Sequence, residues 1–582
     1  MTYNVERAKV GHEPFDIIEM DLDICDNVYS VAPCTASLGS GLECTNTFQL
    51  CQDQANYVKT TKTYKFSSKA HAVIGEKMYP CVNSVKLSPA IAESGKIGVR
   101  AKLTVKLTDF PHNDVGTDPY FSTRSYTPIE QGTFWGKFIA RNPFYVGRTL
   151  RYKKGYFTDP FDAANFQTRT FVIEKISGPD NKGQVTIECK DLLKIAENNR
   201  VTIPAASTGT MAANITDVAT ALSVNAGEGA AYGASGTLRV GNEEMTYSRS
   251  TDAFTVVRGV NGTTAEEHDA DDLVQDAKVW TAVNAVDILH EILTDFVGID
   301  ESRIPYDAGL AVPTGTNDEW DDEKETWILS NNLTRTISSP MGAKDAIEEI
   351  LEQNNLLLWH DQVSDEIKLK ATVPPLGNAT LTTYSESLDL ISNSTVAKKD
   401  ESRRISEVWV YYGKIDNTED AKASNYKFRE ISSDTVVSGV NGYNEPRRKV
   451  IFADWLPSQS LVRQLGGRLS ARYALTPAVI DFELHAKKGD LSIGDLAIID
   501  SDRLQDVNGA NIQQAIQIIS KQDAEGFRYR ALTSSFQGRY GFIGPNSLGD
   551  YSAETDANKA RYAFISLNTG KFADDTRAYK II

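Results

Sequence analysis

The sequence has few cysteines and no long hydrophobic run. No stretch of about 18 apolar residues occurs, so no transmembrane helix is expected. Residues 1–10 are polar and charged, which is not the pattern of a secretory signal. Only 6 of 582 residues are cysteine. Because disulfides persist in oxidising compartments, a chain without an export signal is not expected to have a disulfide framework.

Motifs of known catalytic sites are also missing. Seven histidines are scattered without paired spacing, and no P-loop, G-x-S-x-G or H-E-x-x-H occurs. His290 with Glu291 fits a solvated helix face, the acids of 266–272 fit a solvated loop, and those of 21–26 fit surface charge. Two carboxylates converging in a cleft stay open as an alternative. The expectation is a protein that is not an enzyme.

Basic residues are outnumbered by acidic ones. The chain has 61 Lys and Arg against 78 Asp and Glu, a net charge of −17. This balance argues against a nucleic-acid binder, whose affinity comes from clustered cations. Hydrophobic residues make up 41% of the chain, enough for buried cores, and the length predicts about three to five domains.

Four of the six cysteines fall within 27 residues. Cys25, Cys34, Cys44 and Cys51 have the spacing C-x8-C-x9-C-x6-C. Zinc ribbons place their ligands in closer pairs, whereas an iron–sulfur cluster accepts thiolates from widely spaced loop positions. Spacing alone leaves a metal site and four idle thiols both open. The remaining two, at positions 81 and 189, are expected to be buried small hydrophobes.

Hydrophobic periodicity predicts a mainly β fold with α+β parts. Apolar and polar residues alternate strictly over 99–108, which is typical of a half-buried strand. A second β run is expected from Gly132 through Tyr152, and helices over 289–297, from Ala343 and over 458–473. The predicted parts are a cysteine segment (1–60), a first small β-barrel (61–204), an inserted β module (205–278), an α/β domain (279–395), a second small β-barrel (396–545) and a C-terminal arm with five aromatic residues (546–582).

Several segments resemble known proteins. The stretches 25–34, 43–48 and 51–53 are similar to the cysteine region of tail-hub proteins of tailed bacteriophages, including the lambda-type tail-tip family, in which the gap between the cysteine pairs is longer. Residues 107–120 and 132–135 resemble the same proteins. The plan of two barrels around an α/β part is similar to hub proteins of contractile tails and related injection machines.

The inserted module carries a separate resemblance. Residues 236–247, together with R-G-V-N-G-T-T-A-E-E-H at 258–268, are similar to a small β module of phage tail and baseplate proteins.

The resemblance implies a structural hub protein of a phage tail tip, made in the host cytoplasm and located in the virion. It implies a homotrimer whose six barrels form a pseudo-sixfold ring, joining the tail tube to the central tip or fibre and lining the channel through which DNA passes. Its implied partners are the distal tail or tail-tube protein, the tip or fibre protein, the tape-measure protein, and phage DNA in transit only.

The lambda-type resemblance also implies a cofactor. That family binds a [4Fe–4S] cluster, so Cys25, Cys34, Cys44 and Cys51 are expected to ligate one here, in a structural role. Two alternatives come from other functional classes: a tail-associated cell-wall hydrolase, and a receptor-binding adhesin that uses the module at 205–278.

Overall fold

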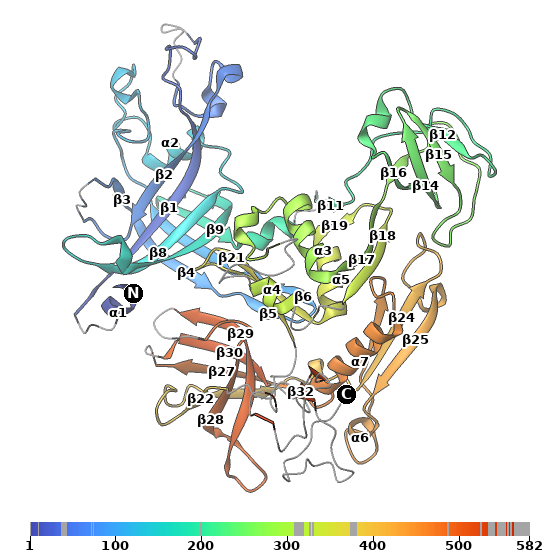
Figure 1. The fold of residues 1–582 in the computed structure, drawn as a ribbon. Coiled ribbons are helices and arrows are strands. Elements are labelled where there is room, and N and C mark those ends of the chain that lie inside the picture. Colours follow the sequence, from blue (N-terminus) through green and yellow to red (C-terminus); the bar gives the residue numbers. More distant parts are fainter. Residues whose placement is uncertain are drawn as a thin grey trace. The chain divides into compact units, whose positions relative to one another are not determined.

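The computed structural model divides the chain into two compact units. The first contains residues 1–90, 100–195 and 360–367, and the second contains residues 91–99, 196–359 and 368–582. The chain is mainly β with α+β parts, as predicted (Figure 1). The structure describes residues 2–7, 9, 11–36, 44–71, 73, 75–197, 201–307, 319–324, 328, 331–372, 381–485, 488–489, 491–523, 527–533, 542–543, 554–555, 558 and 562–563.

An eight-stranded sheet in the order β3-β2-β1-β8-β9-β10-β7-β4 forms the first unit. Its strands are β1 (Glu13–Cys25), β2 (Lys59–Ser67), β3 (Met78–Pro80), β4 (Val82–Ser88), β7 (Lys102–Thr108), β8 (Thr149–Phe157), β9 (Phe166–Ser177) and β10 (Gln184–Lys190). Helical segments are α1 (Thr2–Arg7), α2 (Phe134–Arg141), η1 (Phe48–Leu50), η2 (Gln54–Asn56), η3 (Phe121–Thr123), η4 (Ala163–Asn165) and η5 (Leu192–Glu197). Because β1 lies between β2 and β8, the predicted cysteine segment supplies a central strand of the first sheet.

The alternation over 99–108 produces a strand only in its second part. In β7, Leu103, Val105 and Leu107 are buried while the residues between them face outward, as predicted. Val99 instead ends a hairpin in the second unit, and the backbone N–H of Ala101 bonds the Asp191 carboxylate at 2.8 Å rather than a neighbouring strand.

The β run predicted from Gly132 is wrong in its first part, because residues 134–141 form α2. Phe134, Trp135, Phe138 and Arg141 are the buried residues of this helix, at the spacing of one helical face. Trp135 stacks on Phe66 of β2 with ring centroids 4.9 Å apart. Packing of these aromatic rings against the sheet therefore outweighs their strand preference.

The predicted β module forms a five-stranded sheet in the order β12-β15-β14-β13-β16 around its own apolar core. All four strands predicted for it are confirmed. Its elements are β12 (Ala221–Ser223), β13 (Ser235–Val240), β14 (Glu243–Ser250), β15 (Ala253–Val257), β16 (Val274–Asp276) and η6 (Glu228–Ala231).

Helices α3 and α5 lie where the α/β part was predicted. The helix that begins as α3 continues as a π-helical turn, η7, before Gly298 ends it with a φ of 78°. This part contains β5 (Ile91–Glu93), β6 (Lys96–Val99), β11 (Thr202–Ile203), β17 (Lys278–Asn284), α3 (Ala285–Glu291), η7 (Ile292–Phe296), η8 (Glu301–Arg303), α4 (Glu319–Glu323), β18 (Asn332–Ile337), β19 (Met341–Gly342), α5 (Ala343–Asn354), β20 (Leu356–Asp361) and β21 (Glu366–Ala371).

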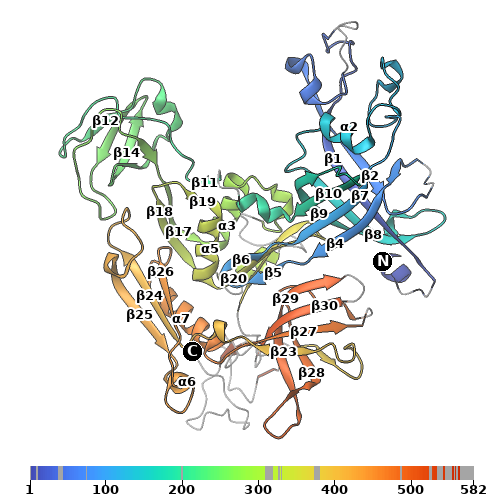
Figure 2. The ribbon, with the colours of Figure 1, turned by 180° about the vertical axis from the view of Figure 1, so that it is seen from behind.

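The predicted second barrel region contains two sheets (Figure 2). A six-stranded sheet has the order β22-β28-β29-β30-β27-β23, and a three-stranded sheet, β25-β24-β26, packs against α7. The elements are β22 (Thr383–Ser385), β23 (Val396–Lys399), η10 (Glu401–Arg403), β24 (Glu407–Lys414), η11 (Ala423–Asn425), β25 (Tyr426–Ser433), α6 (Thr435–Ser438), β26 (Arg448–Ala453), α7 (Gln459–Tyr473), β27 (Ala478–Leu484), β28 (Leu496–Gln505), β29 (Asn511–Asp523) and β30 (Phe527–Thr533).

Most of the predicted C-terminal arm lies outside the described residues, including Tyr551, Phe564, Phe572 and Tyr579. Tyr562 begins the short strand β32 (Tyr562–Ala563), which pairs in parallel with β31 (Phe542–Ile543). Among the described helices, none is both long enough and apolar enough to cross a membrane.

Candidate metal centre in the cysteine arm

The four closely spaced cysteines belong to residues 25–53, called the cysteine arm below. Cys25 is the last residue of β1 and is buried, whereas Cys34, Cys44 and Cys51 are partly exposed. All six cysteines of the chain are free thiols. The β1 ladder fixes the position of Cys25, because that residue pairs with Lys59 of β2.

Two sets of hydrogen bonds bring distant parts of the arm together. The Cys25 N–H donates to the backbone oxygen of Asn46 at 2.6 Å, beside Cys44. The Thr35 N–H and hydroxyl donate to the Asp53 carboxylate at 2.7 and 2.8 Å, beside Cys34 and Cys51. Cysteines separated by 17 to 19 residues in sequence are thereby placed in neighbouring loops.

The thiols of the arm interact electrostatically. Burial raises the pKa of Cys44, and the thiolates of Cys51, Cys25 and Cys34 raise it further, against a hydrogen bond from Asn46 that lowers it. The pKa of Cys51 is likewise raised by burial and by its neighbours. Four thiolates in one region repel one another, so their ionised form is favoured only when a cation is present.

The four thiols, which the structure describes, influence one another electrostatically but do not form a ligand shell. Among the described residues, no three histidine, cysteine, aspartate or glutamate side chains are arranged so that they could hold a metal ion. The Cys44 Sγ accepts from the Asn46 N–H and donates to the Asn46 Oδ1, each at 3.4 Å. Nearby, the Tyr57 hydroxyl is buried without a hydrogen-bond partner, and its pKa is raised to about 12 by burial and by the charges of Cys25, Asp23 and Cys51.

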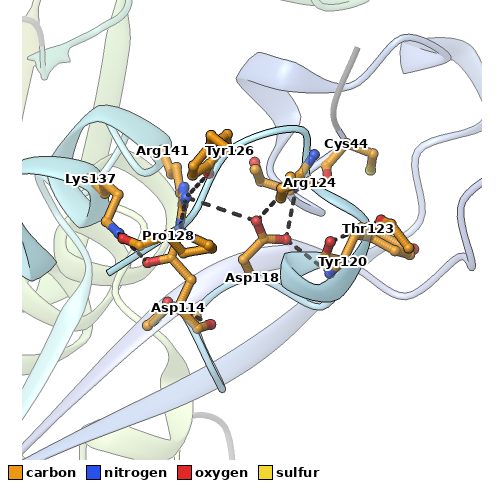
Figure 3. Close-up of polar contacts among 12 residues, drawn as sticks. Cys44, Asp114, Asp118, Tyr120, Thr123, Arg124, Tyr126, Pro128, Lys137 and Arg141 are labelled. Atoms are coloured by element: carbon orange, nitrogen blue, oxygen red, sulfur yellow. Dashed lines mark hydrogen bonds and ion pairs between the residues drawn. The ribbon is translucent and has the colours of Figure 1, made fainter. Parts of the chain in front are cut away.

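Arg124 joins the arm to the loop that precedes α2 (Figure 3). Its guanidinium donates to both oxygens of Asp118, at 2.7 and 2.8 Å, and to the backbone oxygen of Cys44 at 2.7 Å. The Tyr29 N–H of the arm also donates to the Tyr120 hydroxyl at 2.9 Å. Asp118 is fully buried, so this bidentate pair fixes the loop that carries Cys44.

Asp114 extends this network toward α2. It accepts from Lys137 and Arg141 at 2.7 Å each. Burial raises the pKa of Asp114, but the bonds from Arg141 and Lys137 outweigh burial and hold it below the usual range. Arg141 also lies 3.8 Å from Asp118. Sequence analysis did not single out these four charged residues; the only signal was their place in or beside the resembling segments 107–120 and 132–135.

Outside the arm, the sequence candidates have other roles. Cys81 and Cys189 are buried as predicted, and burial raises the pKa of Cys81 to about 12. Glu291 bonds the Trp280 indole N–H at 2.7 Å, while the neighbouring His290 is buried. Asp21 pairs with Arg151, and Asp23 pairs with Lys59 and Arg148.

Residues of the R-G-V-N-G-T-T motif surround two buried glutamates in the module. Arg258 binds both carboxylate oxygens of Glu243 at 2.7 and 2.6 Å, and His268 lies 2.9 Å from the same carboxylate. Asn261 donates to Glu244 at 2.7 Å. The motif therefore holds the module together internally.

Comparisons with protein-family models and with curated proteins give no match. Solved structures show weak similarity. A tail protein from Neisseria meningitidis MC58 is 8% identical, with 78% of this chain and 96% of that chain covered and a TM-score of 0.36. The 43 kDa tail protein of prophage MuSo2 from Shewanella oneidensis is also 8% identical, with 78% and 97% covered and a TM-score of 0.35. The E. coli c3393 protein, a type VI secretion component, is 8% identical, with 84% and 88% covered and a TM-score of 0.30.

Proposed function

We propose that this chain is a structural, non-enzymatic hub protein of a phage tail tip. It would form a trimeric ring that joins the tail tube to the central tip or fibre and lines the DNA channel. The observation that carries the proposal is the contact between two hub-like sequence segments. Residues 25–53 and 107–120 are separate in sequence, yet the Tyr29 N–H donates to the Tyr120 hydroxyl, and Arg124, which follows the second segment, joins Asp118 to the backbone of Cys44.

The cysteine arm would hold a [4Fe–4S] cluster through Cys25, Cys34, Cys44 and Cys51. Such a cluster supplies positive charge, which would offset the mutual repulsion of the four thiolates. A cluster would also stabilise the arm, which has no hydrophobic core in its described part. The large apolar residues there are exposed: Val28, Val31, Phe48 and Leu50. Four sulfur–iron bonds would hold this segment as metals hold other segments that lack a core.

The cluster is tested by purifying the full chain without oxygen. We expect visible charge-transfer absorption and about four irons per chain. Cys44→Ala should lose the iron. Cys189→Ala is the matched control and should keep it, because Cys189 is fully buried in the first sheet, away from the arm. Colourless, iron-free wild-type protein with four reactive thiols in the arm would contradict the cluster while leaving the hub proposal standing.

The hub is tested separately by the mass of the assembled protein. Native mass spectrometry of the full chain should give a multiple of three subunits of 64.1 kDa. A stable monomer at micromolar concentration would contradict a trimeric hub, whatever the iron content.

A further inference from the structure

A cavity rich in cations lies in the second unit. Its volume is about 400 Å³, and six cationic and two acidic side chains line it. The cations are Lys96, Arg403, Arg404, Arg447, Arg448 and Lys449, and the acids are Glu93 and Glu352. Such a concentration of positive charge stands out in a chain whose net charge is −17.

Five segments distant in sequence line the cavity: 93–96, 352–355, 402–405, 447–449 and the end of α7, with Leu469 and Tyr473. The β5–β6 hairpin contributes Lys96 and is anchored by two bonds: Gly95 N–H to the Leu356 oxygen at 3.1 Å, and the Ser94 hydroxyl to Asn355 at 2.6 Å. Residues around η10 and the start of β26 supply the other cations. The hairpin turns at Gly95, whose φ is 78° and where a Cβ would lie 3.0 Å from the Glu352 Cα.

Arg404 is a buried cation without a hydrogen-bonded carboxylate. Its side chain is 2% exposed, and its guanidinium lies 4.1 Å from the centre of the Tyr443 ring. Nη1 donates to the backbone oxygen of Glu445, whereas Nε has no hydrogen-bond partner. The nearest carboxylates, of Glu401 and Glu445, are 3.4 and 3.7 Å away and more than half exposed. Burying a charge with such weak ionic partners costs free energy unless a bound anion pairs with it.

Carboxylates neutralise only part of the remaining charge. The pairs are Arg403 with Asp400 at 3.0 Å and Glu93 at 3.4 Å, Arg448 with Glu407 at 2.7 Å, and Lys449 with Glu352 at 2.7 Å. Arg447 lies 3.6 Å from Glu445, too far for a hydrogen bond, and no ion pair of Lys96 is found within the described part of the chain. Two accessible cations therefore remain for a ligand beside Arg404.

Positive charge also extends behind the cavity. Arg472 of α7 is fully buried and donates to Gln517 at 2.6 Å. Burial lowers its pKa, and so does the charge of Arg403 in the cavity wall. An anion bound at the cavity would relieve this repulsion.

We infer that the cavity binds a compact, multiply charged phosphate-class oxyanion. Guanidinium groups match phosphate oxygens in a two-pronged geometry, and the volume lies in the range of small-molecule sites. The acidity of the whole chain disfavours an extended polyanion such as DNA, because long-range repulsion acts on every phosphate outside the cavity.

Calorimetric titration of the full chain with pyrophosphate in low salt tests this site. We expect about one pyrophosphate per chain, and binding weakened at least about tenfold in the double variant Lys96→Ala, Arg447→Ala, because two charge-assisted bonds are lost. The matched control is Lys398→Ala, Lys399→Ala, which removes two exposed cations from β23 in the same unit and should bind as the wild type does.

Citrate and a DNA duplex serve as competing ligands. Weaker binding of citrate and of the duplex than of pyrophosphate supports a phosphate-class site. Tighter binding of citrate, or affinity that grows with duplex length, would overturn the assignment. So would the absence of pyrophosphate binding at millimolar concentration, or equal weakening in the control variant.

Discussion

Glu243 illustrates at the scale of one residue how this chain accommodates a buried charge. Burial alone raises the pKa of its carboxyl group. The bidentate bond from Arg258, the N–H groups of Glu266 and Gly259, and the His268 ring outweigh burial and hold the pKa below its usual range. A carboxylate with so many donors is stable only while it remains ionised.

Glu243→Gln should therefore destabilise the module. Removing the charge leaves Arg258 buried without its partner, at a cost of about 3 kcal/mol. Hydrogen exchange of the β14 and β15 amides in the full chain would then accelerate about 100-fold. Asp271→Asn, which changes an exposed acid of the same module, should leave the exchange unchanged. Equal exchange in wild type and Glu243→Gln would show that this ion pair contributes nothing to the stability of the module.

The lowered pKa of Glu243 also predicts that the stability of the module depends on pH. Because the pKa of Glu243 is lowered in the folded state, its contribution to the stability of the module is fully present above its unfolded-state pKa near 4.5. The contribution is lost as the pH falls through the lower, folded value. Exchange of the β14 amides, corrected for its intrinsic rate, should accelerate below about pH 4.5 in the wild type. The acceleration should be smaller in Glu243→Gln, and an equal acceleration would assign the acid sensitivity to other groups.

At the scale of elements, α2 depends on a residue outside the helix. Thr133 precedes the helix but makes no capping bond with its side chain. Asp109 takes that role: its Oδ1 accepts from the Trp135 N–H at 2.8 Å and from the Phe110 N–H at 2.9 Å. A carboxylate near a helix N-terminus is favourable because it satisfies free N–H groups.

Asp109→Ala should loosen the start of α2 by about 1 kcal/mol. Amide exchange over 134–141 should accelerate about fivefold, since 1.4 kcal/mol corresponds to a factor of ten. Asp109→Asn keeps an acceptor oxygen and should destabilise the start of α2 less than Asp109→Ala does. Identical exchange in Asp109→Ala and wild type would contradict the capping role.

At the scale of the whole molecule, net charge opposes the proposed trimer. Each chain contributes −17, so three copies repel one another at low ionic strength. We expect association to strengthen between about 20 mM and 300 mM sodium chloride, because screening shortens the range of the repulsion. Sedimentation velocity measures this, with sucrose as an uncharged control. Dissociation at high salt would indicate that the subunits are joined mainly by ion pairs.

Local pattern and composition were sufficient for many elements. The alternation of Leu103, Val105 and Leu107 predicted β7, and the leucine spacing after Ser458 predicted α7. The module strands followed from β-branched runs bounded by turn residues. These predictions succeeded because each element's own periodicity shows which of its faces is buried.

Contacts between distant segments could not be predicted in this way. The aromatic residues at 134–138 suggested a strand until packing on Phe66 made them a helix face. Arg124 was not singled out, although it binds both Asp118 and the backbone oxygen of Cys44, which lies 80 residues before it in sequence. The cationic cavity draws on residues 93 to 473, and no local pattern connects them. The amino-acid order alone decided which face of each helix or strand is apolar and which cysteines lie close together in the sequence. Tertiary packing decided which charges meet, because electrostatic and hydrogen-bonded contacts depend on distances in space rather than along the chain.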